Sequence, residues 1–523
     1  MLRKYPADNE SEVVIAVPAG PEESSYGQIL KSSSIMGSVA VLTLFLGMIR
    51  MKFAAVLIGT TGVGLLANFT ALQGFIGAIA GLGVQSSAVR EVSAAYAKGD
   101  DQTVGETVLT LRRICWLTGL LGGSSTLLLS PLVSQMTFSS DEYQWDIAAI
   151  GLIILFANLS GGQTALLQGA RKIADLAKAQ VVGAVAGTAI TIGFYFWLGL
   201  RGIIPALVLM AAAQLLIAWR FAKRLPVPRV EMTWRESFNK AGDMVRLGVV
   251  MMWTGLMGSA VAYATAALIT QQINLQAVGI YSAAFALSGM FVNFVLNAME
   301  ADYYPRLTAA ADDHSKMNRL VNEQTEIGLL LALPGLLATM VLAPWIVQIF
   351  YTKEFLPAVE LIQWFILGCL GRVISWPLGF LMLALGRWKW YFATESLAQL
   401  AHIVLILAGI IFLGISGVAI AFFILYVFYS LLVLGVARSI TDFFWSKATL
   451  GLIALSLVAA LSNLLLTISS FTDISIYYGI STVLLATAVC LRCLVRRLGS
   501  DNKFVQGVFR VPGLNSLFRV HER

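Results

Sequence analysis

The sequence predicts an all-α, polytopic membrane protein with about fourteen transmembrane helices. Hydrophobic residues make up 58% of the 523-residue chain and charged residues only 12%, and the mean hydropathy is +0.79. Soluble domains carry roughly 25% charged residues, so a water-soluble fold would leave too much of this apolar surface exposed. The apolar residues also gather in windows of about 20 residues, which is the length of helix that crosses a hydrocarbon core roughly 30 Å thick.

Fourteen such windows follow one another along the chain, and an even number places both termini on the same side of the membrane. They lie at 32–58, 62–88, 107–131, 146–168, 179–199, 202–222, 244–270, 277–300, 325–350, 358–386, 391–413, 416–437, 447–468 and 475–494.

The distribution of lysine and arginine predicts which side that is. With a cytoplasmic N-terminus, 31 of the 36 basic residues fall in the tails, in the cytoplasmic loops or in the helix turns beside them. The periplasmic loops then keep only Arg201 and Lys353, and three basic residues lie inside windows. If one helix had been missed, every later loop would be assigned to the wrong side of the membrane and the charge asymmetry would be lost. The positive-inside rule therefore supports this helix count and cytoplasmic termini.

The N-terminal stretch, the cysteines, the histidines and the net charge argue against several other functions. The N-terminal stretch is polar and acidic and has no basic segment leading into a short apolar run, so it predicts a cytoplasmic tail and not a cleavable signal peptide. The four cysteines lie in or beside apolar windows and the three histidines are scattered. No metal site, catalytic constellation or cofactor is expected, and the net charge of +7 reflects topology and not nucleic-acid binding.

Glycine and arginine landmarks indicate an internal repeat. Gly64 and Gly74 in VGLLANFTALQG recur as Gly279 and Gly289 in VGIYSAAFALSG, 215 positions later. Similar offsets relate three further pairs: Arg90 to Arg306, Gly169 to Gly386, and the GLRG glycines to those of GISG. We therefore expect helices 1–6 to repeat as helices 7–12, with the two bundles related by a pseudo-two-fold axis along the membrane normal and the substrate path between them.

This pattern divides the chain into six segments. They are a cytoplasmic tail (1–30), an N-terminal six-helix bundle (31–222), a cytoplasmic linker (223–243), a C-terminal six-helix bundle (244–440), helices 13 and 14 (441–495), and a basic cytoplasmic tail (496–523).

Several segments in this order resemble one known family. They are GTTGVGLLANF, LLQGARK, AVGIYSAAFAL, YYPRL, and the run from FYTKEFLPAVELIQWFILG through LMLALGRWKWYFATES. From about residue 30 to 440 the chain is similar to the polysaccharide transporters of the multidrug/oligosaccharidyl-lipid/polysaccharide (MOP) superfamily, the O-antigen flippases. The resemblance implies a non-enzymatic flippase of the bacterial inner membrane. It would move an undecaprenyl-pyrophosphate-linked oligosaccharide to the periplasmic leaflet by alternating access, where a polymerase and chain-length machinery would use it.

A flippase must shield a sugar and a pyrophosphate from hydrocarbon, so charges deep in the windows are candidate ligands of the substrate. Arg372 lies near the midplane of helix 10, too deep for its guanidinium to reach water easily. It would bind the anionic head group, or else pair with a buried carboxylate. Arg50 and Lys52 lie in the outer half of helix 1, about 200° apart around the helix, so both cannot face one cavity; Lys52 could instead reach the membrane surface.

The remaining candidates lie nearer the cytoplasmic ends of helices. Arg112 and Arg113 in helix 3 face either the substrate or the lipid head groups. Arg90 and Arg306 would catch the pyrophosphate as it enters, or simply satisfy the positive-inside rule and the helix dipole. Glu395 in helix 11 is the first choice for a proton or sodium site, or for a partner of an arginine.

Two other functions remain open. A membrane-embedded polymerase or ligase of envelope polysaccharides would need catalytic groups at the periplasmic surface, where the predicted loops are short. A cation or drug antiporter of the same superfamily would need carboxylates inside the membrane, whereas the deepest charges here are Arg50, Lys52 and Arg372.

Overall fold

The structure is a computed structural model that describes residues 25–468 and 472–498, and within these residues the chain is helical with no strand. Fourteen α-helices and two short 3-10 helices follow in order: α1 (Ser25–Gly81), α2 (Val84–Lys98), α3 (Asp101–Phe138), α4 (Gln144–Gly169), α5 (Ile173–Leu198), η1 (Gly199–Gly202), α6 (Ile203–Ala222), α7 (Trp234–Gln272), α8 (Leu275–Thr308), α9 (His314–Val341), α10 (Ala343–Phe350), η2 (Lys353–Phe355), α11 (Ala358–Ala384), α12 (Trp388–Thr441), α13 (Lys447–Ile468) and α14 (Thr472–Leu498).

The helices account for fourteen membrane crossings. Ten helical stretches of the described chain are long and apolar enough to cross, and three of these are 47, 50 and 54 residues long. Each of the three reverses direction at a glycine with positive φ, namely Gly59, Gly199 and Gly414. Counting these stretches as two crossings each and adding α7, which is 39 residues long, gives fourteen. The chain is therefore a multi-pass membrane protein, as its sequence predicts.

Local backbone geometry repeats between the two halves. Gly199 (φ 55°, ψ −129°) and Gly414 (φ 62°, ψ −140°), which lie 215 positions apart, adopt nearly the same left-handed conformation at equivalent turns. A side chain at either position would be strained, so both turns require glycine.

Several boundaries differ from the sequence prediction. The predicted window 62–88 is interrupted at Leu82 and Gly83, which both have positive φ, and α2 begins after them. Helix α9 begins at His314, well before the predicted residue 325, because Asp313 caps it through its side chain. Helix α7 begins at Trp234, inside the predicted linker 223–243, where Thr233 and Glu236 form a capping box. Residues 1–24 and 499–523 of the predicted tails lie outside the described residues.

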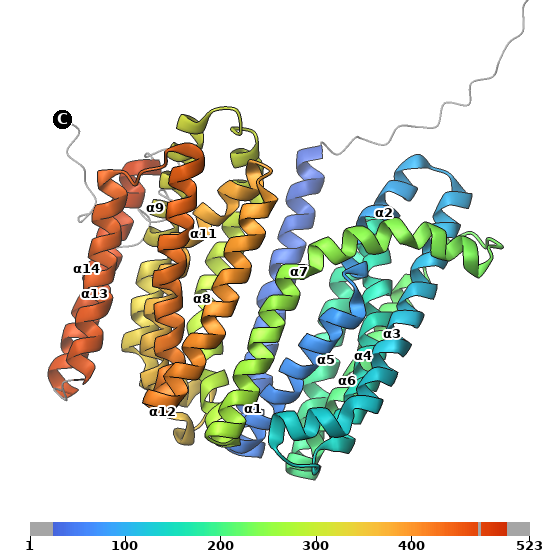
Figure 1. The fold of residues 1–523 in the computed structure, drawn as a ribbon, viewed down its shortest axis with the longest axis horizontal. Coiled ribbons are helices and arrows are strands. Elements are labelled where there is room, and N and C mark those ends of the chain that lie inside the picture. Colours follow the sequence, from blue (N-terminus) through green and yellow to red (C-terminus); the bar gives the residue numbers. More distant parts are fainter. Residues whose placement is uncertain (1–24, 469–471, 499–523) are drawn as a thin grey trace, which may run out of the picture.

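Figure 1 shows the helices in two groups, with α1–α6 in one and α8–α14 in the other. We call the side on which α1 begins and α14 ends the terminal side, and the other the opposite side. The first turns of α7 run across the terminal side before the helix bends into the molecule. One large apolar cluster spans both groups and includes Leu72, Ile150, Ala284, Leu333 and Leu370, all of them buried.

The two groups meet closely near the opposite side at Gly64 and Gly279, the glycines that the repeat pairs. A Cβ atom at Gly64 would lie 2.0 Å from the carbonyl oxygen of Leu275, and one at Gly279 would lie 2.1 Å from that of Thr60. The amide of Asn68, on α1, also donates to Thr270 Oγ1 (2.9 Å) on the neighbouring helix α7. Backbones can approach this closely only where both residues lack a side chain.

Candidate functional site: two cavities in repeat-equivalent positions

The C-terminal cavity, of about 310 Å³, lies between α11 and α12 and contains Arg372 and Glu395. The other lining side chains are mostly aromatic or neutral: Ser375, Trp376, Phe380, Tyr391, Gln399, Leu425, Tyr426 and Tyr429, with Gly379 and Ala398. Arg372 lies at the middle of α11, so the cavity extends from the centre of the membrane-spanning region toward the terminal side.

Arg372 binds a neutral partner. Its guanidinium Nη1 donates a hydrogen bond of 2.8 Å to Asn293 Oδ1 on α8. Among the described residues, no carboxylate lies within ion-pairing distance of Arg372. The arginine is thus held in place by one amide, and its remaining N–H donors are available to an anionic ligand.

Glu395 lies in the same cavity and accepts a short hydrogen bond from the hydroxyl of Tyr429, both residues belonging to α12. The two residues come from the two arms of that helix, which Gly414 folds back on itself. The carboxylate is therefore tied to a neutral donor and not to the arginine.

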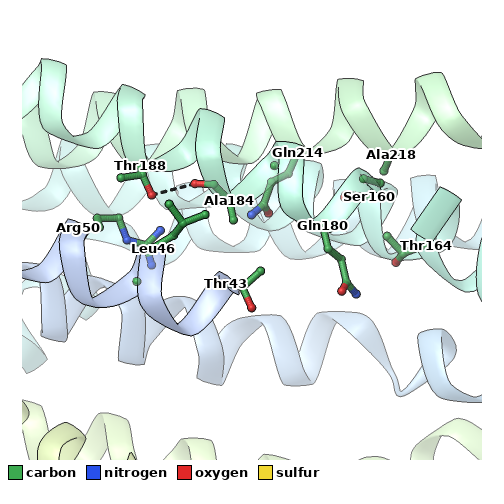
Figure 2. A pocket seen from close by; sticks show the side chains of 13 residues that line it. Thr43, Leu46, Arg50, Ser160, Thr164, Gln180, Ala184, Thr188, Gln214 and Ala218 are labelled. Atoms are coloured by element: carbon green, nitrogen blue, oxygen red, sulfur yellow. Dashed lines mark hydrogen bonds between the residues drawn. The ribbon is translucent and has the colours of Figure 1, made fainter. Parts of the chain in front are cut away.

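The N-terminal cavity, of about 380 Å³, is enclosed by α1, α4, α5 and α6. It is lined by Thr43, Leu46, Gly47, Arg50, Ser160, Thr164, Ala179, Gln180, Gly183, Ala184, Thr188, Gln214 and Ala218. Figure 2 shows Arg50, Leu46 and Thr43 on α1 facing the polar side chains of the other three helices. The Arg50 guanidinium donates to Met210 Sδ at 3.3 Å, and a thioether is a weak acceptor.

The internal repeat relates the two cavities. Phe380, Glu395 and Gln399 of the C-terminal cavity each lie 216 positions after a lining residue of the N-terminal cavity, namely Thr164, Ala179 and Gly183. Tyr429 likewise lies 215 positions after Gln214. The same places in the two bundles therefore form cavities, but with different side chains.

Comparisons with known proteins agree with this fold. Residues 55–360, more than half of the chain, match the model of a family described as "Polysaccharide biosynthesis protein". The chain belongs to this polysaccharide biosynthesis protein family.

The chain is similar to two lipid III flippases in sequence and to two transporters of known structure in fold. The lipid III flippases of Escherichia coli (strain K12) and Shigella flexneri are each 23% identical to it over 386 residues, which is 70% of this chain and 88% of theirs. An inward-facing multidrug resistance MATE family transporter of the MOP superfamily aligns with a TM-score of 0.65 at 14% identity, over 76% of this chain and 94% of its own. The lipid II flippase MurJ in an inward closed conformation aligns with a TM-score of 0.61 at 15% identity, over 90% and 99%.

Lys52 and Arg113 of this polysaccharide biosynthesis protein contact backbone carbonyls and lie outside both cavities. The Lys52 ammonium donates to the carbonyls of Gln348 (2.9 Å) and Tyr351 at the end of α10, on the opposite side. The guanidinium of Arg113 donates to the carbonyls of Met232 (2.9 Å) and Thr233 (3.0 Å) and stacks 4.7 Å from the ring centroid of Trp234. The Lys52 contacts hold α10 against α1, and the Arg113 contacts hold the start of α7 against α3.

Arg90, Arg112 and Arg306 are exposed on or near the terminal side. Arg306 pairs with Asp302 one helical turn earlier at 3.1 Å, while Arg90 lies on α2 and Arg112 on α3. None of the three lines either cavity.

Sequence reasoning did not single out Asn293, Tyr429, Gln180 or Gln214, which contact or line the cavities. They are neutral, and a neutral amide or phenol in an apolar helix carries no signal comparable to a buried charge. The repeat offset offers one signal, because it pairs Gln214 with Tyr429 on equivalent helices.

Proposed function

We propose that this protein is a flippase that moves an undecaprenyl-pyrophosphate-linked oligosaccharide, an O-antigen or related envelope repeat unit, from the cytoplasmic to the periplasmic leaflet by alternating access. Membership of the polysaccharide biosynthesis family and the resemblance to lipid III flippases support a lipid-linked substrate. We assign the terminal side to the cytoplasmic face of the bacterial inner membrane, since the sequence-based topology assigns 31 of the 36 basic residues to the cytoplasmic tails, the cytoplasmic loops or the helix turns beside them.

One observation carries the proposal: each bundle holds a polar cavity with an arginine that has no described carboxylate partner. A charge inside the membrane is costly, by about 2.5 to 3.5 kcal/mol on insertion scales, unless water or a ligand solvates it. The anionic pyrophosphate head group of the substrate provides that solvation while it is bound. Arg372, oriented by Asn293, is the first head-group ligand in this proposal, because a guanidinium can bind phosphate oxygens through two donors.

The other charged residues take secondary roles in the proposal. Arg90, Arg112 and Arg306 lie near the cytoplasmic surface, where they attract the pyrophosphate as it enters. Glu395, half-buried and hydrogen-bonded to Tyr429, is the site at which H⁺ or Na⁺ couples to transport. Lys52 and Arg113 contribute to packing and not to binding, because backbone carbonyls accept their hydrogen bonds.

The test is to delete the gene and locate the lipid-linked repeat units in spheroplasts with an impermeant carbohydrate-oxidising reagent. A flippase predicts chemically normal units that stay protected on the cytoplasmic leaflet, together with loss of surface polysaccharide. Units that reach the outer leaflet but remain unpolymerised would instead assign the protein to polymerisation or ligation. Normal surface polysaccharide with altered sensitivity to cationic drugs would assign it to drug antiport.

A further inference from the structure

The walls of the N-terminal cavity present neutral hydrogen-bonding groups. Gln180, Gln214 and Ser160 line it and make no hydrogen bond with any other described residue. The hydroxyl of Thr43 donates to the carbonyl of Val39 at 2.9 Å, and that of Thr188 donates to the carbonyl of Ala184 at 2.8 Å (Figure 2), so each bonds within its own helix. Their oxygens therefore remain as acceptors, and the two amides offer both donors and acceptors to the cavity.

Arg50 is the one charged residue among the side chains that line this cavity. Its guanidinium carries five N–H donors, and its described partner is the thioether of Met210. Polar groups without partners are costly in a membrane interior unless water or a polar ligand satisfies them. The cavity is thus suited to a ligand with many hydroxyls and one negative charge.

The repeat-equivalent cavity shows that this lining is not a general feature of the fold. Where the C-terminal cavity has Trp376, Phe380 and Glu395, the N-terminal cavity has the smaller, neutral residues Ser160, Thr164 and Ala179, each 216 positions earlier. These replacements remove two aromatic rings and a carboxylate. They leave room for a ligand and no negative charge to oppose an anion.

We propose that the N-terminal cavity binds a sugar ring that carries a carboxylate, of the uronic acid type. Arg50 holds the carboxylate through two parallel N–H donors, a geometry that suits a planar anion. Gln180, Gln214 and the threonine hydroxyls hold the ring hydroxyls. The cavity volume, about 380 Å³, lies within the range of roughly 300 to 1,000 Å³ that is common for small-molecule sites.

The neutral polar lining favours a sugar carboxylate over the pyrophosphate at this site. Gln180, Gln214 and the threonine hydroxyls match ring hydroxyls, which a pyrophosphate lacks, and Arg50 matches the single charge of a carboxylate. This inference rests on the proposed function, since it assigns part of the same substrate to a second cavity. It names the chemical class of the oligosaccharide, which the proposed function leaves open.

The test measures binding of two neutral-aglycone probes, methyl β-glucuronide and methyl β-glucoside, to the full-length protein in lipid nanodiscs by titration calorimetry. The wild type should bind the glucuronide about tenfold or more tightly than the glucoside, since a charge-assisted hydrogen bond is worth that much in affinity. Arg50→Gln should remove this preference, and Arg50→Lys should keep part of it. Gln214→Leu should weaken both probes, while Arg201→Gln, a matched change at an exposed turn of the same bundle, should leave both unchanged.

Three results would overturn the assignment. They are equal binding or no binding of the two probes by the wild type, an unchanged preference in Arg50→Gln, and inorganic pyrophosphate displacing the glucuronide through an Arg50-dependent site. Translocation of lipid-linked units, measured on the same preparations, separates this inference from the proposed function. Translocation without a glucuronide preference refutes only the cavity assignment, and a preference without translocation refutes only the flippase.

Discussion

At the residue scale, the partner of each charge indicates its role. Arg372 donates to the neutral amide of Asn293, so removing the arginine leaves no buried charge uncompensated. Arg497 of α14, by contrast, pairs with Glu326 of α9, a buried carboxylate that also accepts from the hydroxyls of Ser446 and Thr449. The first arginine is available for a ligand, whereas the second joins helices.

For Arg372 we expect loss of transport without loss of protein. Arg372→Ala should abolish polysaccharide export while membrane abundance stays near normal, because only one hydrogen bond, worth about 1 kcal/mol, is removed. Arg372→Lys should restore export in part, since an ammonium lacks the planar pair of donors. Export and abundance are measured together, with Arg201→Ala as the control. Export that falls only in proportion to abundance would contradict a role in binding.

For Arg497 we expect a loss of protein stability. Arg497→Ala leaves the buried Glu326 carboxylate without the cation that pairs with it, so thermal stability in detergent should fall. The double variant Arg497→Ala/Glu326→Gln should recover much of the loss, because the uncompensated charge is gone. A double variant no more stable than Arg497→Ala would argue against the ion pair as the cause.

The sequence predicted part of the site at this scale. It singled out Arg50 and Arg372 because deep charges are rare, and it separated Arg50 from Lys52 because they lie on different faces of one helix. It did not reveal that Arg113 binds carbonyls more than a hundred residues away, or that Asn293 orients Arg372. Such partners follow from tertiary packing, which a single sequence does not encode in a local pattern.

At the element scale, close backbone contacts at glycines join the two bundles. Gly64 of α1 and Gly279 of α8 bring backbones together near the opposite side, and the repeat makes them equivalent residues; Gly83 and Gly248 form a second such contact, where a Cβ at Gly83 would lie 2.1 Å from the Gly248 carbonyl oxygen. The sequence predicted the repeat and its glycine pairs. It did not predict which glycines lie at the contacts between the halves, because composition does not distinguish a glycine at an interface from one facing open space.

Paired glycines of the repeat provide a matched experiment. Gly279→Ala places a Cβ 2.1 Å from the Thr60 carbonyl oxygen, so the helices must separate, and we expect reduced stability and loss of export. Gly74→Ala is the control, since a Cβ at Gly74 meets no atom within 4 Å. An equal effect of Gly74→Ala would contradict the proposed close contact.

At the scale of the whole molecule, the apolar windows predicted fourteen crossings, and the described helices provide them. The boundaries were less predictable. The apolar pattern ran through the break at Leu82 and Gly83, and it missed the first turns of α7, which cross the terminal side and carry too many charged and polar residues for a membrane-spanning window. Helix caps formed by Thr233 and Asp313 set those starts.

The orientation of the molecule can be tested with single cysteines. A cysteine at Ser139, after α3, should react with an impermeant thiol reagent from the periplasm, and one at Arg229, before α7, should not. Native cysteines give little background because Cys115, Cys369 and Cys490 are buried and Cys493 is partly buried. Labelling of the Arg229 variant from outside would invert the assignment of the two sides.

The central claim is that this protein alone moves a lipid-linked oligosaccharide across a bilayer. The most direct measurement reconstitutes the purified full-length chain into liposomes that contain a fluorescent polyprenyl-pyrophosphate-linked oligosaccharide. An impermeant quencher then reports how much substrate has reached the outer leaflet. If the protein is a flippase, the quenched fraction will exceed the half expected of a static bilayer and will return to that half in the Arg372→Ala variant. A quenched fraction that stays at half with the wild-type protein, under any imposed H⁺ or Na⁺ gradient, would contradict this function.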